Sequence, residues 1–521
     1  MPVPPTTCNR CGDVVEEGAD PKDELAELNA LLERLKLKRC ALRRKVNRFR
    51  SPIVRQLPAE VTSIIFEFCL PDFTDHPLSP DIKEDRSIPL SLGAICSYWR
   101  GIAWSTPSLW SSLVIRDPSK HNPHISTGIA QEWLARSGGL PLSIHILSTF
   151  NNKTVLALID IINQYSNRWF NLDLYIPDSY YQRFHSSDNQ AVIHAPILKS
   201  IRFHRPTHAS ESGLNFQLAS CPRLERASLS YFPMDGSKIQ WDNLTHLTLH
   251  SMFFADTFRI LRKCPRLVFC EVSDFCSHHR EQRIGRPVLS SIRSLKLLIA
   301  HFVQFFNNLI APHLEEFNIQ DPRYYVPIPR IEAVTSFLSR SACSLRSLSM
   351  MFTVAPQYFE GFMNLLQSMP SLTTLSLLST TALLITTPEE YHPRNILQLV
   401  SKVLSSQSTS HQQGFLPNLE ILEYTGGLYL HSGNYDDLYP LPPTDNAGRG
   451  PLHLLKLNLH GTFRIPENMI SYISSLAERG VTVNVLSSSE DILQSSIDYY
   501  RSREDLLCRD WTDSLDLSLF S

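Results

Sequence analysis

The six residues LTHLTL at Leu244–Leu249 decide the fold of this 521-residue chain. Apolar residues fall at the first, fourth and sixth positions, and threonine or histidine fills the places between them. The alternation over the last three residues is typical of a strand whose two faces have different surroundings. The phrase therefore predicts a short strand in which Leu247 and Leu249 share one face and His246 and Thr248 share the other.

The same spacing recurs along the second part of the chain. Ten phrases keep apolar residues at these three offsets, and their first positions are 20 to 47 residues apart. Random placement would not preserve three offsets in a chain that is 43% apolar, so we predict ten similar strands. The phrases are Leu198/Ile201/Phe203, Leu224/Ala227/Leu229, Leu244/Leu247/Leu249, Leu267/Cys270/Val272, Ile292/Leu295/Leu297, Leu314/Phe317/Ile319, Leu345/Leu348/Met350, Leu372/Leu375/Leu377, Leu419/Leu422/Tyr424 and Leu454/Leu457/Leu459.

Amphipathic stretches lie between the phrases, at residues 254–263, 331–340, 358–369 and 466–479. One strand and one helix in roughly 20–30 residues resemble a leucine-rich repeat. Such a unit cannot bury its own apolar face, so neighbouring units stack into a curved solenoid with the strands on the concave side. The Asn or Cys that follows the last leucine of regular repeats is missing here. We therefore expect an irregular solenoid over residues 116–490, followed by a polar tail at 491–521.

The concave face of such a solenoid would carry the side chains that flank the repeat leucines. In two successive phrases these include Arg226, Ser228, His246, Thr248 and His250, and we expect them to contact a ligand. Their mixed chemistry favours a protein or peptide ligand over a small anion.

A second pattern occupies residues 51–115. Residues 53–70 read IVRQLPAEVTSIIFEFCL, and residues 88–113 read IPLSLGAICSYWRGIAWSTPSLWSSL. Proline suits the first turn of a helix, and Leu57-Pro58 precedes apolar residues at helical spacing. The text predicts a small helical bundle with an insert at residues 72–87.

The order of short motifs in this bundle resembles an F-box: Leu-Pro-x-Glu, then Cys-x-x-Trp-Arg, then Pro-x-Leu-Trp. By that resemblance the bundle docks on a Skp-type adaptor, which hangs from a cullin scaffold in a ubiquitin ligase. A bundle of this size also needs an inner face, so roughly half of the implied docking residues should be buried. The residues that the resemblance implies are Leu57, Pro58, Val61, Ile64, Ile65, Leu92, Ile95, Cys96, Trp99 and Trp110.

Residues 22–50 precede the bundle and follow a tail at 1–21 that we expect to be disordered. Apolar residues step by alternating threes and fours, which is the pattern of a coiled-coil helix; a single amphipathic helix lying on the next domain fits it as well. The second half is strongly basic, which is compatible with nucleic-acid contact or nuclear import but is more simply a solvated face. The stripe consists of Leu25, Leu28, Leu32, Leu35, Arg39, Leu42, Val46 and Phe49.

No catalytic motif of the P-loop, HExxH, GxSxG or GxGxxG type is present. Cys8 and Cys11 form half of a metal motif without a second pair. Cys270, Cys276, His278 and His279 have metal-binding side chains, but Cys270 occupies a core position of a repeat, so we expect no metal there. The sequence therefore predicts no catalytic residues, no metal and no cofactor.

Composition limits the remaining classes. A formal net charge of −2 gives no overall field for nucleic acid or an anionic membrane. The 11 scattered cysteines do not suggest a disulfide framework, and no apolar stretch is long enough for a signal peptide or a membrane span, so we expect an intracellular protein.

Taken together, these observations predict an α+β chain with an N-terminal helix, an F-box bundle and a repeat solenoid. The resemblance implies a substrate-recognition subunit of a Skp–cullin–F-box ubiquitin ligase, with an unidentified protein substrate and self-association through residues 22–50 as an open alternative. Three other readings stay open: a binding scaffold without a degradative role, an enzyme hidden in the solenoid, and a nucleic-acid binder that uses the basic helix.

Overall fold

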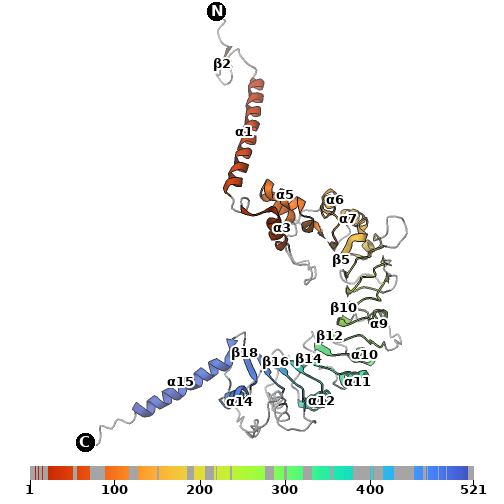
Figure 1. The fold of residues 1–521 in the computed structure, drawn as a ribbon, viewed down its shortest axis with the longest axis vertical. Helices are drawn as coiled ribbons and strands as arrows, with labels where there is room; N and C mark the ends of the chain where they lie inside the picture. Colours follow the sequence, from red (N-terminus) through yellow and green to blue (C-terminus); the bar gives the residue numbers. More distant parts are fainter. Residues whose placement is uncertain are drawn as a thin grey trace, which may run out of the picture. The chain divides into compact units, whose positions relative to one another are not determined.

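A computed structural model gives the fold, which is of the mixed α+β class with one large, mostly parallel sheet (Figure 1). The chain divides into two units, Met1–His145 and Ile146–Ser521, and the division falls inside a strand. The structure describes residues 6–7, 10, 14–15, 21–50, 56–70, 88–116, 127–149, 152–184, 193–205, 216–218, 220–234, 237–275, 287–298, 302–320, 331–352, 356–379, 399, 403, 415–427, 451–460, 465, 467–478, 480–487 and 490–513.

The first unit contains the predicted N-terminal helix and the predicted bundle. Two short strands pair antiparallel, Thr6 with Val15, in the segment that we expect from the sequence to be a disordered tail. Its elements are β1 (Thr6–Thr7), β2 (Val14–Val15), α1 (Pro21–Arg50), α3 (Ala59–Phe68), α4 (Ile88–Ile95), α5 (Ser97–Ser105), η1 (Pro107–Trp110), β3 (Ser112–Arg116), α6 (Thr127–Arg136) and β4 (Leu142–Leu147).

The second unit is built on a sheet whose strands follow chain order from β5 to β19, with β7 and β9 paired separately. Successive strands are parallel up to β18, and β19 returns antiparallel. The strands are β5 (Trp169–Tyr175), β6 (Ser200–His204), β7 (Phe216–Leu218), β8 (Arg226–Ser230), β9 (Ser237–Ile239), β10 (His246–Met252), β11 (Phe269–Phe275), β12 (Ser294–Leu298), β13 (Glu316–Gln320), β14 (Ser347–Phe352), β15 (Thr374–Ser379), β16 (Ile421–Gly427), β17 (Leu454–His460), β18 (Thr482–Ser487) and β19 (Glu490–Asp491).

The register of this sheet aligns the predicted phrases. Leu247 of β10 pairs with Ala227 of β8 on one side and with Cys270 of β11 on the other. The same alignment continues through β15, so equivalent apolar side chains stack from strand to strand on one face. Leu247 and Leu249 are fully buried, as the alternation predicts.

The last predicted phrase, Leu454/Leu457/Leu459, is wrong by two residues. Pairing with β16 puts Leu455 opposite Leu422 and Leu457 opposite Tyr424. The phrase is therefore Leu452/Leu455/Leu457, whose three side chains are buried. The error arises because residues 452–459 are leucine-rich enough to fit the spacing in two registers, and only the neighbouring strand selects one.

Several phrases begin at the end of a similar turn, in which the amide of the first leucine of the phrase donates to the carbonyl three residues earlier. The amide of Leu224 donates to the carbonyl of Cys221 over 3.1 Å, and the amide of Leu267 donates to the carbonyl of Cys264 over 3.3 Å. Both cysteines are buried, and burial raises the pKa of Cys221 to about 11 and that of Cys264 to about 12. They are unreactive core residues, because burial disfavours the thiolate.

Helices of the second unit follow many of the strands, and α9 to α12 lie along one side of the row of strands in Figure 1. Aromatic side chains join successive helices: Phe258 lies 5.4 Å from Phe305, and Phe306 lies 5.3 Å from Phe337, between ring centroids. The helical elements are α7 (Lys153–Asn163), η2 (Ser166–Arg168), α8 (Asp178–Tyr181), α9 (Phe254–Lys263), α10 (Phe302–Asn307), α11 (Ile331–Ser341), α12 (Pro356–Gln367), α14 (Glu467–Glu478) and α15 (Ile492–Asp513).

Part of the expected C-terminal tail is the 22-residue helix α15. Asp491 begins it: one carboxylate oxygen accepts hydrogen bonds from the amides of Leu493, over 3.0 Å, and Gln494, over 3.2 Å. The buried hydroxyl of Ser496 accepts from the amide of Ile465, which anchors the first turns to the rest of the unit.

Several sequence predictions lie outside the described residues. They concern the insert at residues 72–87, the Cys8/Cys11 pair, and the three metal-type residues Cys276, His278 and His279.

Candidate functional site

The first candidate surface is the outer side of α3. This helix carries two apolar stripes, because Thr62 and Phe66 face the bundle while a second set at positions i, i+3, i+4 and i+7 stays in contact with water. We call this second set the head patch. Its members and their exposed fractions are Val61 (41%), Ile64 (52%), Ile65 (44%) and Phe68 (86%).

Phe68 is absent from the ten residues implied by the resemblance, yet it is the most exposed member of the head patch. The signal that could have found it is the helical spacing, since Phe68 continues the stripe of Val61, Ile64 and Ile65 by one turn. A large apolar side chain with most of its surface in water contributes nothing to the core. It is the kind of residue that marks an interaction surface.

The structure divides the ten implied docking residues between surface and interior. Pro58, Val61, Ile64, Ile65 and Ile95 are exposed. Leu57, Cys96 and Trp99 are half-buried, and the rings of Trp99 and Phe66 lie 4.9 Å apart. Leu92 and Trp110 are buried. Only the exposed and half-buried residues are therefore available to a partner in this conformation.

Trp110 is fully buried in the helical bundle of residues 51–115, which we call the head. Its indole nitrogen donates to the carbonyl of Ala103 over 2.7 Å, and its ring lies edge-on to Trp104 at 5.2 Å and to Trp133 at 4.8 Å. The guanidinium of Arg136 lies 5.0 Å from the ring of Trp104 and 4.9 Å from that of Trp110.

Trp133 and Arg136 belong to α6, which lies beyond the expected end of the bundle at residue 115. The indole nitrogen of Trp133 also donates to the carbonyl of Ser112 over 3.0 Å. Helix α6 is thus part of the head, and the unit boundary at His145 lies further along the chain than the sequence predicts.

The second candidate surface is the face of the sheet opposite its buried leucines, which we call the polar face. Strand pairing puts His246 beside Arg226, Thr248 beside Ser228, and His250 beside Ser230. The five residues that the sequence singles out therefore share one face on two adjacent strands. The same face continues across the sheet, because Glu271, Lys296, Asn318 and Ser349 follow Thr248 in successive strands.

Opposite charges on the polar face stand on neighbouring strands. Lys296 lies 3.2 Å from Glu271 and Lys456 lies 3.8 Å from Glu423. Arg202 lies 3.1 Å from Asp173, which is buried. Because each of these charges has a partner of opposite sign, the three pairs present little net charge to a ligand.

Histidines gather at one part of this face. The rings of His204 and His250 are stacked 6.5 Å apart, and His250 shares a hydrogen bond between its Nδ1 and the hydroxyl of Ser273. Burial lowers the pKa of His204 to about 4, and it lowers the pKa values of His246 and His250 as well. These rings are neutral at pH 7, so this part of the face offers hydrogen-bonding and stacking groups more than positive charge.

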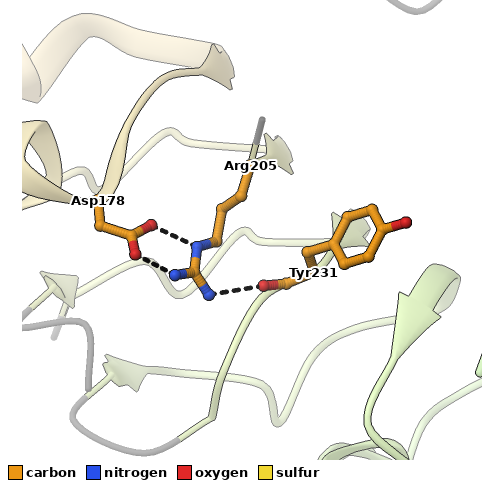
Figure 2. Close-up of polar contacts among 3 residues, drawn as sticks. All are labelled: Asp178, Arg205 and Tyr231. Carbon is orange, nitrogen blue, oxygen red and sulfur yellow. Dashed lines mark hydrogen bonds and ion pairs between the residues drawn. The ribbon is translucent and has the colours of Figure 1, made fainter. Parts of the chain in front are cut away.

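An ion pair between the buried Arg205 and the half-buried Asp178 connects elements next to His204 in the chain (Figure 2). One edge of the Arg205 guanidinium binds Asp178: Nε donates to one carboxylate oxygen and Nη2 to the other. Nη1 of Arg205 donates over 2.8 Å to the carbonyl of Tyr231, a residue in the left-handed backbone region. Arg205 therefore joins α8, the end of β6 and the end of β8, a role that the sequence did not suggest.

No cluster of three or more histidine, cysteine or acidic side chains suited to a metal occurs within the described ranges. Cys270 is buried between Leu247 and Leu295 in the sheet, and burial raises the pKa of its thiol. Among helices in the described part of the chain, none combines the length and the apolar character needed to cross a membrane.

No protein-family model matches the chain, and no curated protein matches it.

Proposed function

We propose that this protein is the substrate-recognition subunit of a Skp–cullin–F-box ubiquitin ligase. In this proposal the head is an F-box that binds a Skp-type adaptor, and the second unit is an irregular leucine-rich-repeat solenoid that binds the protein to be modified. The protein would have no active site of its own.

The observation that carries the proposal is the exposure of the head patch. Val61, Ile64, Ile65 and Phe68 form one stripe on α3, while the same helix buries Phe66 against the rest of the bundle. A helix that is apolar on both sides needs a partner for the outer one. The resemblance to an F-box supplies the chemistry of that partner, an adaptor with an apolar helical groove. Buried aliphatic and aromatic anchors provide most of the energy of such interfaces.

The second unit supports the receptor role through the order of its strands. Consecutive parallel strands with helices between them are what stacked repeats produce. The polar face then offers a long row of side chains of mixed chemistry, from Arg202 to Lys456. Such a surface suits an extended polypeptide better than a compact ligand, because its side chains are spread over many successive strands.

The mechanism follows from this arrangement. A receptor of this kind accelerates ubiquitin transfer by holding the target close to the charged conjugating enzyme, which raises the effective concentration of the target lysine. The receptor's own contribution is binding and orientation.

The test is binding of purified Skp-type adaptor to the full chain, with cullin recovery from cell extract as the second readout. Ile64→Asp places a charge in the head patch and should abolish adaptor binding. The matched control is Ile129→Asp, since Ile129 is a 43% exposed isoleucine on α6 of the same unit. Circular dichroism and a thermal melt establish that both variants fold.

The proposal fails if the intact chain binds no adaptor, or if Ile64→Asp and Ile129→Asp bind equally well. Adaptor binding without recovery of a cullin would favour the alternative of a binding scaffold without a degradative role.

A further inference from the structure

Helix α1 presents an uncovered apolar stripe. Each of the 25 side chains from Lys22 to Val46 is exposed. The leucines among them include Leu25 at 60%, Leu32 at 50% and Leu35 at 54% exposure. This 30-residue helix therefore needs a packing partner, because most of the stability of a helix in a protein comes from packing of its apolar side.

The heptad pattern gives the geometry of the missing contact. Leu25, Leu32, Arg39 and Val46 occupy one core position of successive heptads, and Leu28, Leu35 and Leu42 occupy the other. Such a stripe packs against a second helix with the same repeat. Arg39 is the one charged residue of the stripe within the part of α1 whose side chains are described.

Charge along α1 is segregated by halves. Residues 22–33 contain Lys22 and four acidic residues, a net charge of −3, whereas residues 34–50 contain nine basic residues and no acidic one. Two copies in parallel would set the basic halves side by side and would place Arg39 against Arg39 in the core. Two antiparallel copies set each acidic half along a basic half, and they place Leu35 opposite Arg39.

We propose that α1 associates with α1 of a second copy of this chain as an antiparallel coiled coil. The acidic half of each copy would lie along the basic half of the other and offset part of its charge, which favours a second copy in the antiparallel orientation. This inference is independent of the proposed ligase function, since it uses no residue of the head patch or the polar face.

The first experiment is sedimentation of the full chain across a concentration series. The wild type should be a dimer that dissociates on dilution. Leu35→Asp, in the stripe, should give a monomer. Leu37→Asp is the matched control, because it is the same substitution two residues away. Leu37 lies on the opposite side of the helix, and its side chain is 71% exposed. It should remain a dimer.

The second experiment reads the orientation. A Leu28→Cys/Val46→Cys variant should form a cross-link between position 28 of one copy and position 46 of the other under mild oxidation, identified by peptide mapping. Raised salt should weaken the dimer, because the complementary halves are screened.

Three results would overturn the proposal: a monomeric wild type at every concentration, a dimer that Leu35→Asp leaves intact, or cross-links that join position 28 to 28 and 46 to 46. The last would mean a parallel dimer.

Discussion

A methyl group added at Gly93 would fall 1.9 Å from Cζ3 of the Trp104 ring, so α4 and α5 approach each other more closely there than any side chain permits. The backbone carbonyl of Gly93 also accepts a 2.8 Å hydrogen bond from Nε of Arg100. This contact joins α4 and α5, and it is the reason why a glycine occupies the interior of α4 despite its conformational cost.

Gly93→Ala should therefore destabilise the head by about 1–3 kcal/mol, as overpacking does, because Trp104 must shift away from its packed position. Gly101→Ala is the control within α5, since no atom lies within 4 Å of its added methyl group. That substitution should raise stability by ~0.5–1 kcal/mol. Urea denaturation of the two variants measures the difference, and equal midpoints would contradict the close contact.

Two phenylalanines of α3 should behave in opposite ways. Phe66 is 1% exposed and Phe68 is 86% exposed. Phe66→Ala should lower the free energy of unfolding by about 3–5 kcal/mol through the cavity it leaves. Phe68→Ala should change stability by less than ~0.5 kcal/mol, yet it should weaken adaptor binding if the proposed function is right. Parallel thermal melts and binding isotherms separate the two effects.

The Arg205–Asp178 pair should be costly to break. Only 4% of the Arg205 side chain is exposed, so Arg205→Met would remove the ion pair with Asp178 and the hydrogen bond to the carbonyl of Tyr231. We expect a loss of ~3–5 kcal/mol. Arg183→Met removes an ion pair with Asp160 in which both side chains are 40% exposed or more, and it should cost less than ~1 kcal/mol. Urea midpoints that are equal for Arg205→Met and Arg183→Met would refute the larger contribution assigned to the Arg205 pair.

Acid should destabilise the second unit partly through His204. Burial depresses the pKa of this imidazole in the folded state to about 4, against 6.5 as its ordinary value. Between those two pH values the unfolded chain binds a proton that the folded chain does not. The contribution of neutral His204 to the free energy of unfolding is therefore fully present above pH 6.5 and is lost as the pH falls toward 4.

His204→Gln should flatten the dependence of unfolding free energy on pH in that window, where the native histidine accounts for up to ~3 kcal/mol. His246→Gln is the comparison: its pKa is lowered in the same direction, but the ring is exposed, so its effect should be smaller. An unchanged pH profile for His204→Gln would show that another group controls acid unfolding.

The periodic parts of the fold could be predicted from the sequence. Nine of the ten phrases have their second and third residues in the registers that pair the strands, because alternation directly determines which side chains face the core. Leu454/Leu457/Leu459 failed because leucines at 452, 454, 455, 457 and 459 satisfy the spacing twice. Pairing of Leu455 with Leu422 then selects the register.

The surfaces were predicted less completely. The helical spacing puts Val61, Ile64, Ile65 and Phe68 on one face of the helix. It could not tell that this face stays in water while Phe66 points inward. Nor could it show that Trp110 is enclosed by Trp104, Trp133 and Arg136, since Trp133 and Arg136 come from a helix beyond the expected boundary. Those assignments depend on contacts between segments distant in sequence.

The sequence by itself determined the repeating strands, the helices between them and the heptad stripe of α1, because local periodicity sets which side chains share a face. Tertiary structure alone decided which apolar residues of the head remain exposed, which register β17 adopts, and that Arg205 lies between Asp178 and Tyr231. These outcomes depend on long-range packing and on pairing of buried charge, and neither leaves a mark in the spacing of neighbouring residues.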